Sequence, residues 1–130
     1  MSGTEARGGH VVLDYIGYTP PVEGDGDWML QLLRSSVQRA GVREVHSHVE
    51  QFDGTESPPG FAAVVLIDES HVSAHCYSES GLLAIDIFTC GDGFDPTQAA
   101  HLIVEALQSE DSEIAEVTRG WLDPVVIASG

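Results

Sequence analysis

The chain has 130 residues, of which 42% are hydrophobic, 21 are acidic and five are basic, and its formal net charge is −16 at pH 7. This length suits one domain, 1–130, while the negative charge disfavours binding to DNA or RNA. No apolar run approaches the roughly 20 residues that cross a bilayer, and residues 1–9 lack the apolar core of a signal peptide. We therefore expect a cytoplasmic protein without a membrane or nucleic-acid partner.

The first half of the chain predicts a strand, a helix and two further strands. β-Branched and aromatic residues favour the strands, and the third is a nearly continuous apolar run. Asp25 or Asp27 should cap the helix, and Gly41 should end it. The expected bounds are 10–17 for the first strand, about 25–40 for the helix, and 43–52 and 61–67 for the later strands, with a turn-rich loop at 53–60.

The second half predicts a β-hairpin, a helix and a short strand. Two extended runs flank a turn at 78–81, and Asp95 and Pro96 have the residue types that open a helix. The expected strands are 72–77, 82–89 and 114–117, and the apolar helix face is Ala99, Leu102, Ile103, Ala106 and Leu107. The order predicts an α+β fold: a two-layer α/β sandwich, with two helices on one face of an antiparallel sheet.

The hairpin turn also predicts which residues face each other. If the turn centres on residues 79 and 80, the numbers of facing residues sum to about 159 or 160. Cys90 then lies opposite Glu69 or Ser70, beside the peptide bond that joins them. Cys76 lies several residues along the strand, too far to form a disulfide with Cys90.

Three polar side chains alternate after this bond. His71, Ser73 and His75 should share one face of the strand because successive residues point to opposite faces. We interpret this as a hydroxyl, imidazoles and a thiol gathered at one end of the hairpin.

Two segments resemble the prokaryotic S-adenosylmethionine decarboxylase proenzymes. The first runs from Glu69-Ser70-His71 to His75, and the second, residues 85–91, contains Phe-Thr-Cys-Gly with its cysteine at Cys90. The histidine follows the serine by five residues and the cysteine follows it by twenty, as in that family. The similarity is strong over about 61–107 and weaker but collinear over 9–52.

The resemblance implies self-cleavage between Glu69 and Ser70, giving a β chain (1–69) and an α chain (70–130). Ser70 would become a pyruvoyl group, so no external cofactor is needed. This ketone would form a Schiff base with the substrate amine and accept electrons during loss of CO2. His75 would assist processing, and Cys90 would return a proton to the substrate carbon.

The resemblance also implies a substrate site and an assembly. Phe52 aligns with an aromatic residue that stacks on adenine, and Glu79 with a carboxylate that binds the ribose hydroxyls. The substrate is a small cation, S-adenosylmethionine, and its product supplies aminopropyl groups for polyamine (spermidine) synthesis. The active sites of the family lie between two protomers, so a homodimer is expected.

Some positions depart from the family pattern. Ala62 stands where a serine usually helps processing, and Cys76-Tyr77-Ser78 replaces the usual Thr-Trp-Pro. Two alternatives follow: a pyruvoyl-dependent arginine or ornithine decarboxylase of the same fold, or an unprocessed, non-catalytic homologue that acts as a binding or regulatory subunit.

Several of these residues also have purely structural readings. Phe52 could be a core aromatic, Cys90 could be a small buried core residue, and Cys76 could be structural or incidental. His46 and His48 alternate as two metal ligands can, but no further ligands follow them, so no metal is expected.

Overall fold

The computed structural model describes residues 6–90, 95–107 and 112–120, and the side chains of residues 9–89 and 95–107. In these ranges, six strands and two helices follow one another along the chain. Their bounds are β1 Ala6–Ile16, α1 Asp25–Arg39, β2 His46–Phe52, β3 Gly60–Ile67, β4 Ser70–Tyr77, β5 Leu82–Cys90, α2 Pro96–Leu107 and β6 Ser112–Gly120. None of the described helices is long and apolar enough to cross a membrane.

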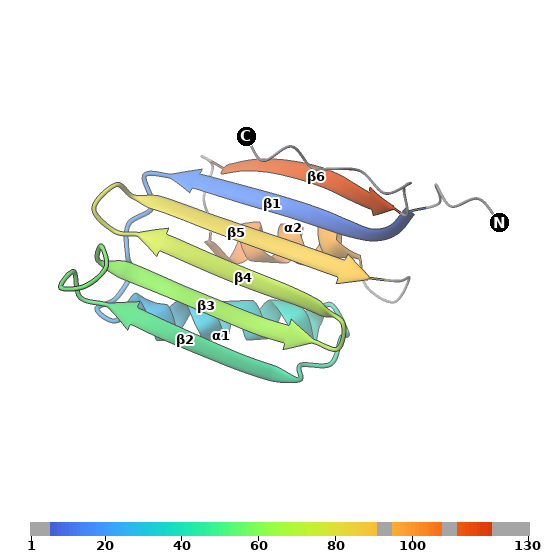
Figure 1. Ribbon diagram of the computed structural model, residues 1–130, viewed down its shortest axis with the longest axis horizontal. Coiled ribbons are helices and arrows are strands. Elements are labelled where there is room, and N and C mark those ends of the chain that lie inside the picture. The colour runs from blue at the N-terminus through green and yellow to red at the C-terminus, as the bar shows by residue number, and fades with distance from the viewer. Residues whose placement is uncertain (1–5, 91–94, 108–111, 121–130) are drawn as a thin grey trace.

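The six strands form one antiparallel sheet in the order β2-β3-β4-β5-β1-β6. Figure 1 shows both helices behind this sheet, on the same side. The opposite face, hereafter the open face, is covered by none of the described elements. This arrangement confirms the predicted two-layer α+β sandwich.

The hydrophobic core lies between the sheet and the helices. Alternate residues of each central strand are buried against α1 and α2, as expected for a sheet with one covered face. Met29, Leu33 and Val37 recur at helical spacing along α1, and each is fully buried against the sheet. The fully buried strand residues include Val11, Leu13, Val65, Val72, Leu83, Ile85 and Ile87.

The start of α1 differs from the prediction. The residue before the helix is Gly24, which has a left-handed backbone (φ 70°), and the helix has no side-chain cap. Asp25 is buried, and its carboxylate accepts hydrogen bonds from the Tyr18 hydroxyl (3.2 Å) and the Gln51 amide (3.4 Å). Gln51 also accepts a hydrogen bond from the Gly26 backbone N–H (2.8 Å). The Asp25 carboxylate thus joins α1 to β2.

The other element ends follow from pairing and capping. The Asp95 carboxylate accepts a hydrogen bond from the Thr97 backbone N–H (3.0 Å), which confirms Asp95 as the N-terminal cap of α2. β2 begins at His46, three residues later than predicted, because His46 pairs with Leu66 near the end of β3. β6 is longer than predicted because it pairs along most of β1.

Candidate active site

The Glu69–Ser70 bond lies in a tight turn between two interior strands. Ile67 of β3 pairs with Ser70 of β4, so Asp68 and Glu69 form a two-residue turn. Asp68 has φ 46° and is the one non-glycine residue of the described chain with a positive φ. Non-glycine residues adopt this conformation at an energetic cost, and such strain is common at functional sites.

The register of β4 and β5 fixes the position of Cys90. His71 pairs with Phe88 and Tyr77 with Leu82, so the numbers of facing residues sum to 159. This confirms one of the two predicted registers, and by extension the Cys90 backbone comes opposite Glu69. The same backbone pairs with Gly8 of β1. The side chain of Cys90 lies outside the described residues.

Ser70 and His75 point to opposite faces of the sheet. The Ser70 side chain belongs to the buried, helix-covered face, whereas His75 is exposed on the open face, opposite Ala62 and Ala84. Five residues of strand separate their Cα atoms by roughly 16 Å, at about 3.3 Å a residue. Within one protomer the structure therefore does not gather these groups at one end of the hairpin, and that interpretation is wrong for His75.

The open face carries a polar cluster that sequence reasoning missed in part. The predicted alternation of His71, Ser73 and His75 is confirmed, but the acceptor for the first two, Asp86, was not foreseen. Its carboxylate accepts hydrogen bonds from Ser73 Oγ (2.8 Å) and bonds to Nε2 of His71 (3.3 Å) and of His10 (2.6 Å). A lone carboxylate within the apolar run 82–89 was the available signal.

The neighbours of Asp86 hold it in its charged form. Burial acts to raise its pKa, but the hydrogen bonds from His10 and Ser73 and the charges of His71 and His10 act in the opposite direction. Together they leave the pKa of Asp86 lower than usual.

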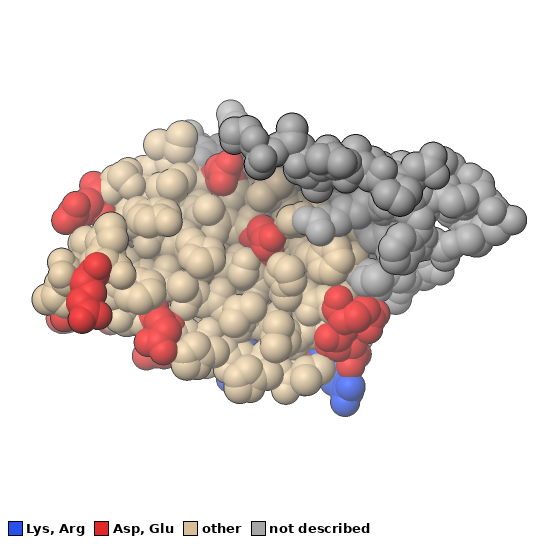
Figure 2. Space-filling view, in the orientation of Figure 1, with Lys and Arg blue, Asp and Glu red and all other residues tan. Residues whose placement is uncertain are grey.

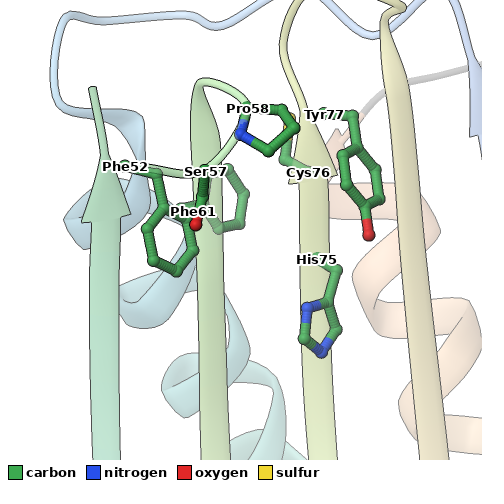
Figure 3. A pocket seen from close by; sticks show the side chains of 7 residues that line it. All are labelled: Phe52, Ser57, Pro58, Phe61, His75, Cys76 and Tyr77. Carbon is green, nitrogen blue, oxygen red and sulfur yellow. The ribbon is translucent and has the colours of Figure 1, made fainter. Parts of the chain in front are cut away.

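A hollow of about 210 Å³ lies where β2 and β4 end. In Figure 3 the rings of Phe52 and Tyr77 stand on opposite sides of it, and His75 lies further down β4. The loop that closes its top is held by a hydrogen bond from the Ser78 N–H to the Pro59 carbonyl (3.0 Å). Its lining residues are Phe52, Ser57, Pro58, Phe61, His75, Cys76 and Tyr77.

The hollow bears on three further residues named in the sequence analysis. Cys76 is buried in its wall, and burial raises the pKa of the thiol, which favours a structural role. Glu79 is exposed in the turn after Tyr77 and does not line the hollow. Phe52 is only half-buried and faces the hollow, so it is not a core aromatic.

A second, shallower hollow of about 340 Å³ lies on the open face beside β3. His48, Glu50, Leu66, His71 and His75 are among its lining residues. Glu50 bonds to His48 Nε2 (2.8 Å) at the exposed edge of the sheet. Among the described side chains, no group of three or more His, Cys, Asp and Glu residues could hold a metal ion.

Comparison with known proteins gives a consistent result. Residues 9–120 match the family model described as S-adenosylmethionine decarboxylase. An S-adenosylmethionine decarboxylase proenzyme of Caldicellulosiruptor saccharolyticus is 36% identical over 127 residues, which are 95% of this chain and 98% of that protein. The proenzyme of Pyrococcus abyssi is 32% identical over 113 residues, 87% of this chain and 78% of its own length.

A solved structure shares the fold. The crystal structure of adenosylmethionine decarboxylase from Aquifex aeolicus is similar with a TM-score of 0.73 and 27% sequence identity. The similarity covers 95% of this chain and 98% of that one.

Proposed function

The chain belongs to the S-adenosylmethionine decarboxylase family, and we propose that it decarboxylates S-adenosylmethionine with a pyruvoyl group made from its own Ser70. The observation that carries this proposal is the position of the Glu69–Ser70 bond. It lies in a two-residue turn beside the strained Asp68, and the register brings the Cys90 backbone opposite Glu69.

The pyruvoyl group requires a cut between Glu69 and Ser70. The Ser70 hydroxyl attacks the Glu69 carbonyl carbon, an ester forms as the C–N bond breaks, and the nitrogen takes up a proton. Loss of the Ser70 α-proton then expels the Glu69 carboxylate. Water hydrolyses the remaining enamine, in its imine form, to the ketone and releases ammonia. When formed, this ketone supplies the electron sink for decarboxylation.

The open face carries His75 and is covered by none of the described elements (Figure 1), which favours a homodimer with shared active sites. Two protomers can pack open face against open face about a two-fold axis that is perpendicular to the strands. The strands of the partner then run in the opposite direction. The His75 end of β4 in one protomer then faces the Ser70 end in the other. Exposed apolar side chains on the open face suit such an interface, namely Ile16 (76% exposed), Tyr77 (47%) and Leu66 (40%). Of the acidic groups visible on this face in Figure 2, most lie near its margins.

The hollow between Phe52 and Tyr77 supports S-adenosylmethionine over arginine or ornithine. Two aromatic rings on opposite sides of a hollow can stack on a flat adenine ring, and neither alternative substrate has such a group. The volume of about 210 Å³ is small for a drug-sized ligand, whose pockets span roughly 300–1,000 Å³. A second protomer would complete the pocket.

The remaining roles follow the family pattern. Cys90 donates the proton that replaces CO2, and His75 assists self-cleavage in the partner. Phe52 stacks on the adenine, and Glu79 binds the ribose hydroxyls from the turn at 78–81. The enzyme works in the cytoplasm, where its product supplies aminopropyl groups for polyamine synthesis.

Intact-mass measurement of the purified protein, followed by an activity assay, tests the proposal. We expect two fragments, 1–69 and 70–130, the second carrying a pyruvoyl terminus, and a single uncut chain for Ser70→Ala. The cut protein should release labelled CO2 from S-adenosylmethionine. A wild-type chain that stays whole for days would favour the non-catalytic alternative. Release from arginine or ornithine alone would overturn the proposed substrate.

A further inference from the structure

The Asp86 carboxylate links three adjacent strands on the open face. It lies on β5 and bonds to His10 of β1 on one side and to His71 and Ser73 of β4 on the other, at 2.6–3.3 Å. Phe88, two residues further along the same face, packs against both imidazoles, with ring centroids 6.1 Å from His10 and 5.6 Å from His71. We call these five residues the Asp86 cluster.

The cluster includes two residues close to the new end of the chain that the proposed cut creates. His71 comes directly after Ser70, so it becomes the second residue of the new chain, and Ser73 becomes the fourth. Before the cut, the turn at Asp68 and Glu69 ties the start of β4 to β3. After the cut that covalent tie is gone, and new chain ends fray unless other contacts hold them.

Stability alone does not account for a carboxylate at this position. The Asp86 side chain is 29% exposed, so its position on the open face is partly buried. Placing a charge in a partly buried position costs free energy, and well-packed apolar residues at such a position often stabilise the fold as much or more. A carboxylate does offer two oxygens that can hold several donors at once, here from both neighbouring strands.

We propose that Asp86 is a positioning residue that holds the first residues of the chain created by the cut, through His71 and Ser73. The ketone at residue 70 is then kept in place for the substrate amine. This role rests on the proposed self-cleavage. Asp86 acts through its neighbours on β4 and needs no contact with the substrate.

The test compares Asp86→Asn in cut and uncut protein. The matched control is Asp14→Asn, which removes one exposed carboxylate from the open face of β1. We expect Asp86→Asn to fold and to cut itself fully by intact mass. Its turnover should fall by about tenfold or more with less than a threefold change in KM, since a misplaced reacting group costs rate more than binding. Asp14→Asn should behave as wild type.

Hydrogen exchange separates positioning from general stability. In the cut Asp86→Asn protein, exchange over residues 71–77 should be about tenfold faster than in the cut wild type. In the uncut Ser70→Ala background, Asp86→Asn should change the exchange rate over residues 71–77 by less than about twofold, because the turn still connects β4 to β3. If the Asp86 variant does not fold, Ser73→Ala, which removes one bond of the cluster, should show the same pattern at about threefold.

Several outcomes would overturn the role. These are equal acceleration of exchange in cut and uncut protein, wild-type turnover in the folded variant, or a folded Asp86 variant that remains uncut. An uncut wild-type chain would instead refute the self-cleavage itself, and the wild-type mass reports that outcome separately.

Discussion

His75 and Ser70 share strand β4 but point to opposite faces of the sheet, five residues apart. A histidine placed in this way cannot reach the Ser70 hydroxyl of its own protomer, because the sheet lies between them. We therefore propose that any assistance from His75 is given to the partner subunit, at the end of the sheet where the turn with the Glu69–Ser70 bond lies.

Mixed dimers test this action in trans. Alone, His75→Ala should cut slowly and Ser70→Ala not at all. When the two are co-expressed in equal amounts and pair at random, about half of all His75→Ala chains are in mixed dimers, where each meets an intact histidine and should be cut quickly. Tagged chains and intact mass give the fraction cut. No acceleration in isolated mixed dimers would show that His75 does not act across the interface.

Ala62 faces His75 directly across the β3–β4 ladder. Directly opposed Cβ atoms in an antiparallel pair lie about 4.5–5.5 Å apart, so a hydroxyl at position 62 would lie close to the imidazole. We expect Ala62→Ser to speed self-cleavage by about tenfold, less than the roughly 10²- to 10⁴-fold of a fully positioned acid–base group, because His75 is already present. The fraction cut is measured against time after synthesis. Ala84→Ser, on the other side of His75, is the matched control and should have a smaller effect.

The interior strands could be predicted from the sequence because one face of each is buried against the helices. The apolar run at 61–67 and the extended runs at 72–77 and 82–89 gave nearly correct bounds for β3, β4 and β5. The hairpin turn gave two possible registers for β4 and β5, one of which is correct. The start of β1 was missed because residues 6–9 include two glycines and carry little strand preference. Pairing with β5 and β6 on both sides makes them part of the sheet.

The contacts that escaped prediction join residues far apart in the chain. His10 and Asp86 are 76 positions apart and meet because β1 lies next to β5. Asp25 had the right residue type for a helix cap, but the distant side chains of Tyr18 and Gln51 bond to its carboxylate. Neither contact leaves a local pattern in the sequence.

The aromatic rings at the hollow should control substrate affinity. Phe52→Ala or Tyr77→Ala removes one ring, and stacking of a base on an aromatic side chain contributes about 1–3 kcal/mol. We expect KM for S-adenosylmethionine to rise by roughly 5- to 100-fold with a smaller change in kcat. Val22→Ala, at an exposed site in the loop before α1, is the control. An unchanged KM in both ring variants would place the adenine elsewhere.

The charge on Asp86 should make part of the stability depend on pH. Its pKa is lower in the folded protein than the usual value of about 3.9, so the folded state binds this proton less readily than the unfolded state. The stabilisation is present at neutral pH and is lost as pH falls below about 5 through the folded pKa. The Tm difference between wild type and Asp86→Asn should therefore persist at pH 6 and shrink between pH 5 and 3. The Asp14→Asn control should show no comparable trend, and a constant difference for Asp86→Asn would contradict the assigned charge.

Cys90 and Cys76 offer a matched pair for testing the proton donor. Extending the β4–β5 register by two residues beyond the His71–Phe88 pair brings the Cys90 backbone opposite Glu69, whereas Cys76 is buried at the other end of β4. Cys90→Ala should not impair cleavage between Glu69 and Ser70, because the proposed attacking group is the serine hydroxyl. It should lower kcat by about 10²- to 10⁴-fold, the range for loss of a general acid. Cys76→Ala should reduce stability by a few kcal/mol at most and keep most of the turnover. Single-turnover CO2 release and intact mass, measured on the same samples, separate the two steps. Full turnover in a cut Cys90→Ala protein would show that another group returns the proton.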